Sequence, residues 1–252
     1  MCIRDSLPPI DFVLLSHNHY DHLDLPTLEA VARHSPNVRF LVPLGNGPLL
    51  EGAGLENIEE LGWGDTTTAG ELTIYCLPNQ HWSRRGIGDG NRALWASWAV
   101  IGPDDRFYFA GDTGYFGGFT PVGEALGPFD LAALPIGAYR PRAMMKPFHL
   151  DPAEAVQAGR DLAARRLIGI HYGTFDLADE EPSEPPELFR AAGRVAGYAP
   201  EDILLPAIGE TIILRGRAEA GPRPAEATRV ESPTSTTDTT GGTTKQSGDE
   251  PS

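Results

Sequence analysis

Short apolar runs recur along the chain, and most of them end in a glycine-containing turn or a polar cluster. Runs of this length are expected of strands buried within a sheet, because helices need longer periodic stretches. The predicted strands lie at residues 11–15, 38–42, 58–61, 72–77, 95–101, 106–110, 129–135, 167–170, 203–205 and 211–214.

Stretches with helical spacing separate several of these strands. Residues 25–34 place leucine, valine and alanine side chains on one helical face, with a proline in the first turn. Residues 151–154 form a capping box, which predicts a helix that continues to Arg166. A third helix is predicted at 187–196, and Gly-Asn-Gly-Pro at 45–48 predicts a turn. The alternation of strands and helices is typical of the α/β class.

Three histidines and an aspartate follow the strand at 11–15 within six residues. His17 and His19 are two positions apart, so in an extended segment they point to the same side and can bind one cation. Asp21 and His22 come where the chain must turn, which directs them to a different place. We therefore expect two metal ions here. The alternative is a polar loop whose histidines satisfy backbone groups.

Later strands also end in residues that can bind a metal. His81 follows the strand at 72–77, and His171 follows the strand at 167–170. Asp112 stands between two glycines after a further strand, where a carboxylate can bridge two cations. Taken singly, a histidine is usually structural and this aspartate fits an Asx turn. The repeated placement at strand ends favours a metal site.

Composition narrows the class of protein. The 252 residues are 40% hydrophobic, which suits one large globular domain, and no run of 18 apolar residues occurs. The net charge of -15 disfavours binding along a nucleic-acid backbone, where a basic stripe is expected. Cys2 and Cys76 are too few for a disulfide framework and no signal-peptide core is visible, so we expect a cytoplasmic protein.

The two ends differ from the rest of the chain. Residues 1–6 lack any periodicity and precede the first ligand closely, so we expect them to be irregular or foreign sequence; the alternative is a short natural arm. Residues 217–252 are rich in Gly, Pro, Thr, Ser and Glu and nearly free of apolar side chains, which predicts a disordered low-complexity tail. The expected folded domain therefore spans residues 7–216.

The order of the strand-end ligands resembles the metallo-beta-lactamase superfamily. Longer blocks resemble, within it, the N-acyl-phosphatidylethanolamine-hydrolysing phospholipase D family and its bacterial relatives. These blocks are 16–24, 80–82, Asp89, Asn91, 94–98, 109–115, 127–132, 135–139, 141–142, His171 and 173–175. The resemblance implies a four-layer αββα sandwich with a two-metal site along one edge. Family members carry several strands of the first sheet ahead of the first motif, and we expect those strands to be missing from this chain.

The resemblance also implies which residues do what. One zinc ion is expected to be bound by His17, His19 and His81, and the other by Asp21, His22 and His171, with Asp112 bridging both. The family further implies that Tyr20 and His149 contact the substrate head group. To these we add Arg142 as a phosphate partner, because guanidinium groups bind phosphate in a bidentate manner.

The activity implied by the resemblance is hydrolysis of N-acyl-phosphatidylethanolamine-like phospholipids. A hydroxide held between the two zinc ions, and so indirectly by Asp21 and Asp112, attacks phosphorus. Two zinc ions, two aspartates and a hydroxide sum to about +1, which attracts an anionic diester. The expected partners are a phospholipid or other anionic phosphodiester, a membrane surface contacted peripherally, and a second copy in a homodimer.

Two alternatives remain at this point, and a third is disfavoured. The same metals could serve another substrate, either a lactone or a different phosphodiester, because one fold hosts many chemistries. The chain could also be an inactive truncated fragment. A flavin-linked di-iron reductase is disfavoured, because that branch usually has a carboxylate at the position of His19.

Overall fold

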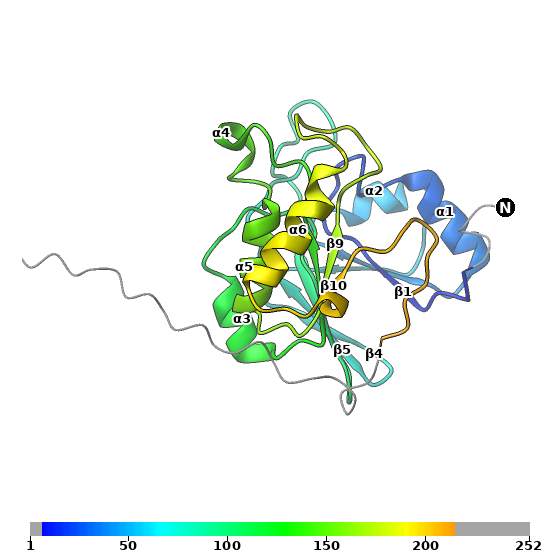
Figure 1. Ribbon diagram of the computed structural model, residues 1–252. Coiled ribbons are helices and arrows are strands. Elements are labelled where there is room, and N and C mark those ends of the chain that lie inside the picture. Colours follow the sequence, from blue (N-terminus) through cyan, green and yellow to red (C-terminus); the bar gives the residue numbers. More distant parts are fainter. Residues whose placement is uncertain (1–6, 215–252) are drawn as a thin grey trace, which may run out of the picture.

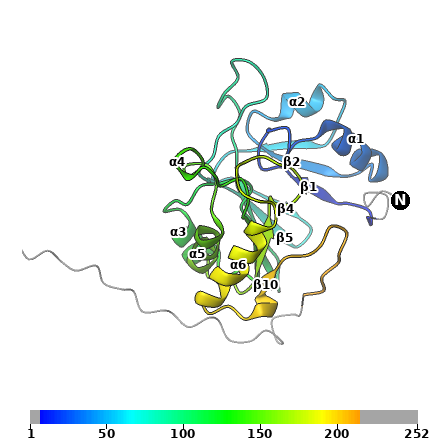
Figure 2. The same ribbon diagram turned by 45° about the horizontal axis from the view of Figure 1, so that its top comes forward.

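Two β-sheets lie face to face, and helices cover their outer faces (Figures 1 and 2). The structure is a computed structural model that describes residues 7–214. Three hydrophobic clusters separate the layers, one between the sheets and one under each helical layer. The predicted α/β class and four-layer αββα sandwich are therefore confirmed.

The first sheet is small and parallel, with the order β1-β2-β3. Its strands are β1 (Phe12–Leu14), β2 (Arg39–Pro43) and β3 (Ile58–Leu61). Helix α1 (Leu25–His34) connects β1 to β2, and the short α2 (Gly47–Glu51) follows β2. Leu28 and Val31 are the buried residues of α1, and they belong to the same core cluster as Phe40 of β2.

The second sheet has the order β10-β9-β8-β7-β6-β5-β4. Its strands are β4 (Thr66–Ala69), β5 (Leu72–Leu77), β6 (Ser97–Ile101), β7 (Arg106–Phe109), β8 (Leu131–Pro135), β9 (Leu167–Ile170) and β10 (Ile203–Leu204). Pairing is antiparallel from β4 to β7 and parallel from β7 to β10. Strands β5, β7, β8 and β9 consequently run in one direction, and their carboxyl ends meet at one edge.

Three helices pack on the outer face of the second sheet: α3 (Phe119–Leu126), α5 (Pro152–Asp161) and α6 (Glu184–Val195). The short α4 (Arg142–Met145) stands above them near the loops (Figure 1), and a 3-10 helix spans Pro200–Asp202. Gly123 lets α3 approach α5 closely, because a Cβ there would lie 2.2 Å from the carbonyl oxygen of Asp161.

Trp98 of β6 joins the two sheets. Its side chain is fully buried in the cluster that also contains Leu41, Ile74 and Cys76. Its indole N–H donates to the carbonyl oxygen of Leu15 at 2.9 Å. That bond fixes the chain just past β1, where the first metal-binding candidates begin.

Several boundaries differ from the sequence predictions. The helix predicted to reach Arg166 ends at Asp161, because Ala163 has φ 52° and the N–H of Ala164 donates back to the carbonyl oxygen of Gly159 at 2.9 Å. The strand predicted at 211–214 is absent there, which is an error of that prediction.

The sequence patterns also missed β4, α3 and α4, and the predicted turn at 45–48 runs into α2. The helix predicted at 187–196 begins earlier, at Glu184. Predictions for residues 1–6 and 217–252 lie outside the described residues. Within 7–214, no helix combines the length and the apolar character needed to cross a membrane.

Candidate metal centre

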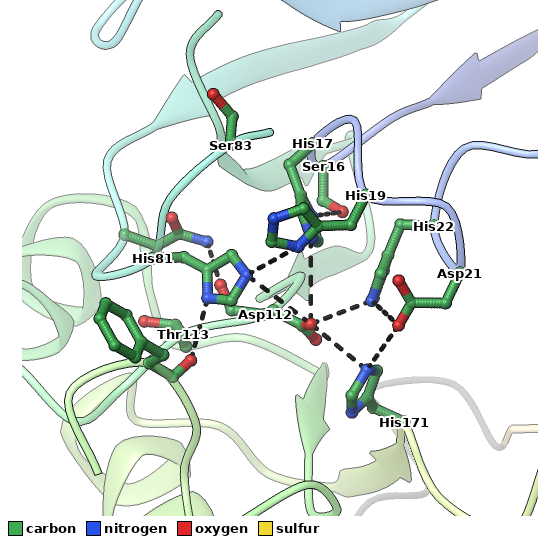
Figure 3. Close-up of polar contacts among 12 residues, drawn as sticks. Ser16, His17, His19, Asp21, His22, His81, Ser83, Asp112, Thr113 and His171 are labelled. Atoms are coloured by element: carbon green, nitrogen blue, oxygen red, sulfur yellow. Dashed lines mark hydrogen bonds and ion pairs between the residues drawn. The ribbon is translucent and has the colours of Figure 1, made fainter. Parts of the chain in front are cut away.

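Four strand ends deliver the predicted ligands to one place (Figure 3). The loop after β1 carries His17, and the carboxyl ends of β5, β7 and β9 lead to His81, Asp112 and His171. Gly111 permits the close approach of β7 to the first loop, since it has φ +61° and a Cβ there would lie 2.6 Å from Cβ of Ser16. The ligand set is thus shared between the two sheets.

Three imidazoles form the first group of ligand atoms. Nδ1 of His19 lies 2.9 Å from Nε2 of His17 and 3.3 Å from Nε2 of His81. Zinc–nitrogen bonds of about 2.0–2.1 Å in tetrahedral geometry separate neighbouring ligand atoms by about 3.4 Å. The observed spacing therefore fits three nitrogen ligands around one cation.

Two carboxylates and two imidazoles form the second group. Nε2 of His22 lies 3.0 Å from Oδ2 of Asp112 and 3.3 Å from Oδ2 of Asp21. Nε2 of His171 lies 3.3 Å and 3.4 Å from the same two oxygen atoms. These separations again match those expected between ligands of a single ion.

Asp112 connects the two groups. Its Oδ2 atom also lies 3.9 Å from Nε2 of both His17 and His81, and the residue is only 2% exposed. The side-chain amide of Asn79 donates to the carbonyl oxygens of Ala110 and Asp112 at 2.9 Å each, which fixes the backbone that carries the carboxylate. A single oxygen atom is thus placed between both candidate positions.

Hydrogen bonds behind the ligands orient two of the imidazoles. Nδ1 of His81 lies 3.0 Å from the carbonyl oxygen of Phe148, which can only accept, so Nδ1 carries the proton and Nε2 keeps its lone pair. Nδ1 of His17 lies 3.0 Å from Oγ of Ser16, which fixes the orientation of the ring. Both Nε2 atoms point toward Nδ1 of His19 (Figure 3).

Burial and charge act differently on the two groups. Burial lowers the pKa of His17 and His19, and lowers the pKa of His81 to about 3, so the first group is uncharged at neutral pH. Burial also acts to lower the pKa of His22, but hydrogen bonds and charge from Asp112 and Asp21 outweigh it and raise that pKa to about 10.

This donor set fits divalent cations. Converging lone pairs in the first group would repel one another without a positive charge between them, because His19 can donate one proton at most through Nδ1. Oδ1 of Asp112 is buried without a hydrogen-bond partner. Nitrogen and oxygen ligands without cysteine suit a catalytic zinc site with open positions rather than a closed structural site.

Of the three predicted substrate contacts, Tyr20 and Arg142 lie outside the candidate ligand groups, whereas His149 offers a ligand atom within 4.8 Å of those of His81 and Asp112 and forms a third candidate group with them. The ring of His149 lies 5.3 Å from that of His81 and 5.5 Å from that of His171. Tyr20 is 71% exposed. Arg142 donates to the carbonyl oxygen of His149 at 2.9 Å and to Glu154 at 2.6 Å, so two of its guanidinium nitrogens already have acceptors.

The sequence analysis assigned no role to several residues that shape the site. Ser16 and Trp82 lie in blocks that carry the family resemblance, but nothing in the sequence indicated that they contact the histidines. Trp82 packs its ring edge-on to His19, with 4.4 Å between ring centroids. Phe148 acts through its backbone carbonyl group, for which no sequence pattern exists.

Comparison with known proteins identifies relatives of this arrangement. A profile of the beta-lactamase superfamily domain matches residues 1–172. The N-acyl-phosphatidylethanolamine-hydrolysing phospholipase D 1 of Caenorhabditis elegans is 44% identical over 187 residues, which cover 70% of this chain and 52% of that protein. The mitochondrial N-acyl-phosphatidylethanolamine-hydrolysing phospholipase D of Saccharomyces cerevisiae is 36% identical, over 82% of this chain and 45% of its own length. The chain spans about half the length of these curated relatives.

Solved structures show the same fold. The metallo hydrolase Igni18 from Ignicoccus hospitalis has a TM-score of 0.63 at 23% identity, covering 80% of this chain and 78% of that one. An isothiocyanate hydrolase from Delia radicum gut bacteria has a TM-score of 0.63 at 21% identity, covering 85% and 80%. By its sequence profile, its fold and its curated relatives, the chain belongs to the metallo-beta-lactamase superfamily, and within it is similar to the N-acyl-phosphatidylethanolamine-hydrolysing phospholipases D.

Proposed function

We propose that this chain is a hydrolase that binds two zinc ions and cleaves phosphodiester bonds of N-acyl-phosphatidylethanolamine-like phospholipids. The observation that carries the proposal is the pair of ligand groups joined through Oδ2 of Asp112. His17, His19 and His81 would hold one ion, and Asp21, His22 and His171 the other. Bound divalent cations supply Lewis-acid activation of water and of the phosphoryl group.

Charge supports an anionic substrate. Two divalent cations bring four positive charges, and the carboxylates of Asp21 and Asp112 remove two of them, while the uncharged histidines remove none. A site that stays positive in a chain of net charge -15 attracts a phosphodiester and holds it at the metals. The names of the curated relatives at 44% and 36% identity support the same substrate class.

His149 is proposed to contact the substrate next to the metals. Its Nδ1 atom is buried without a hydrogen-bond partner, and burial lowers its pKa to about 4, so the ring is neutral at pH 7. A neutral imidazole can hold a proton on one nitrogen and present it to a substrate oxygen. Trp82 and Phe148, whose ring centroids lie 6.3 Å apart, provide an apolar wall beside the neighbouring ring of His81.

Contact with a membrane surface and a cytoplasmic location belong to the same proposal. Tyr20 and Ile87 come from the two neighbouring loops, and Met144 comes from α4; their exposed fractions are 71%, 101% and 69%. Exposed apolar side chains near a site for a lipid substrate favour contact with a lipid surface.

The buried free thiol of Cys76 is compatible with a reducing compartment. Self-association as a homodimer is proposed too, and light scattering after size exclusion tests it.

The first experiment is elemental analysis of the purified chain, followed by a substrate panel. We expect about two zinc ions per chain and release of phosphatidic acid from N-acyl-phosphatidylethanolamine in mixed micelles. A matched panel contains bis(p-nitrophenyl) phosphate and a simple lactone. If the chain binds two zinc ions but hydrolyses only the lactone, the proposed phosphodiester substrate is wrong and the proposed metal centre stands. If the chain binds no metal, both proposals are wrong.

Hydrolysis of a different substrate is the second candidate. A UPF0173 metal-dependent hydrolase of Koribacter versatilis is 29% identical over 69% of this chain, and the isothiocyanate hydrolase shares the fold. The same two ligand groups are equally compatible with hydrolysis of another substrate, so the substrate panel decides between the two candidates.

A further inference from the structure

Arg85 lies in the loop between β5 and β6 and contacts the turn that carries several of the ligands. Its NH1 group donates to the carbonyl oxygen of Leu23 at 2.6 Å and to that of Asn18 at 3.3 Å. Its guanidinium group also covers the ring of Tyr20, with Cζ 3.9 Å from the ring centroid. One side chain thus contacts the beginning, the middle and the end of residues 18–23, which we call the ligand turn.

The loop that presents Arg85 is itself held in a closed conformation. The backbone N–H groups of Arg85 and Gly86 donate to the carboxylate of Asp89 at 3.1 Å and 2.7 Å. At the base of the loop, the N–H of Ser83 donates to Oδ1 of Asn91 at 3.2 Å, and the N–H of Asn91 donates to the carbonyl oxygen of Ser83 at 2.8 Å. These hydrogen bonds order the loop and thereby fix the position of Arg85.

The ligand turn sets how the two groups of ligands are placed relative to each other. His19 belongs to the first group, whereas Asp21 and His22 belong to the second, so all three lie within four residues. Inside the turn, the N–H groups of His22 and Leu23 both donate to the carbonyl oxygen of His19, at 3.1 Å and 2.9 Å. A change in the opening of this turn would move Asp21 and His22 away from His171.

We propose that Arg85 is a positioning residue that holds the ligand turn closed and thereby sets the affinity of the second metal position. The inference rests on the proposed metal centre. Arginine suits the task because its planar group can donate to two carbonyl oxygens while it stacks on an aromatic ring. A lysine at this position would keep the charge but not that combination of contacts.

The test is a titration of the metal-free 252-residue chain with cobalt(II), followed by visible absorption. The variants are Arg85→Ala, Arg85→Lys and, as matched control, Arg84→Ala. Arg84 is the exposed neighbour, and its hydrogen bond goes to the carbonyl oxygen of Gly86 within its own loop. Melting of each metal-free variant is followed in parallel by circular dichroism.

We expect Arg85→Ala to bind one of two cobalt equivalents about 10- to 100-fold more weakly, the usual effect of losing a group that orients a ligand. The cobalt affinity of Arg85→Lys should lie between that of Arg85→Ala and that of the parent chain, and the affinity of Arg84→Ala should equal that of the parent chain. If Arg85→Ala does not fold, the lysine variant carries the same comparison.

Unchanged cobalt affinity in Arg85→Ala would overturn the proposal, even if its metal-free melting temperature falls, because Arg85 would then serve stability alone. Failure of the parent chain to bind cobalt would overturn it as well. Since the readout is metal binding, the absence of hydrolysis with every substrate would contradict the proposed function and leave this result standing.

Discussion

The orientation of individual imidazoles at the centre depends on hydrogen bonds made by the ring nitrogen that faces away from the metal position, as much as on the metals they would bind. His81 is held by the carbonyl oxygen of Phe148, and His17 by Ser16. His19 lacks such a partner at its outer nitrogen, since Nε2 is buried without a hydrogen bond. Its orientation thus depends on the other two histidines, on Trp82 and on a bound cation.

His19→Ala should remove one of the two metals and abolish turnover, because the first group would keep only two nitrogen ligands. Elemental analysis and activity measured on the same sample check this. His34→Ala is the matched control, since His34 lies at the end of α1 and, within residues 7–214, its ring lies at hydrogen-bond distance from the carbonyl oxygens of Leu7 and Pro8, away from the ligand groups. Retention of both metals with full turnover would contradict the zinc assignment.

His149→Ala should lower turnover at least about tenfold, the equivalent of one lost hydrogen bond to a substrate, while both metals stay bound. The residue lies beside His81 and His171 and forms a third candidate group with His81 and Asp112, but each of the two proposed ions has three other ligands without it. Metal content measured with the kinetic constants separates the two roles. Loss of a metal would make His149 a ligand.

The thiol of Cys76 should be inert toward iodoacetamide at pH 8. Burial between the sheets, and to a smaller extent the charge of Asp65, raise its pKa to about 12, so almost no thiolate exists at that pH. Mass spectrometry of a Cys2→Ser variant, which removes the other cysteine, measures the labelling. Labelling as fast as in denaturant would show that the space between the sheets is open.

At the scale of elements, local sequence signals worked best where a helix begins. The capping box at Asp151 is present as predicted: the carboxylate accepts from the N–H groups of Ala153 and Glu154 at 3.0 Å and 2.9 Å. Helices α3 and α4 escaped prediction because α3 contains Pro121 and Gly123 and α4 is a single turn. Their positions follow from packing, which a sequence window does not contain.

Asp151→Ala should lower the free energy of unfolding by about 1 kcal/mol, because two N–H groups at the start of α5 lose their acceptor. Urea denaturation measures it. Ser183→Ala at the start of α6 is the matched control, since Ser183 makes no capping hydrogen bond there, and its expected change is close to zero. Equal effects in the two variants would mean that the cap contributes no stability.

For the whole molecule, the pattern of the sequence predicted the α/β class and placed histidines and carboxylates at strand ends, whereas the αββα layers were implied by the family resemblance. The pattern could not give the distances between these side chains, because His22 and His171 are far apart in the chain and their rings stack, with centroids 5.0 Å apart, only when the sheets pack. Contacts made through the backbone, such as those of Arg85 to Asn18 and Leu23, leave no residue pattern to recognise.

Removal of metal by a chelator should lower the melting temperature by several degrees, and zinc should restore it. Without cations, the converging imidazoles of the first group lose the positive charge between them, and the carboxylates of Asp21 and Asp112 depend on protonation of His22. A ligand that binds only the folded chain stabilises it by mass action. Thermal scans before and after dialysis measure the shift, and identical melting temperatures would contradict a metal centre of this kind.

The division of the ligands between the sheets has a consequence for motion. His17 and His19 follow β1 of the first sheet, whereas His81, Asp112 and His171 follow strands of the second. Neither sheet alone holds a complete ligand group, so ions bound here would lose ligands if the two sheets moved apart. The rate at which a chelator removes a bound metal would therefore depend on the relative motion of the two sheets.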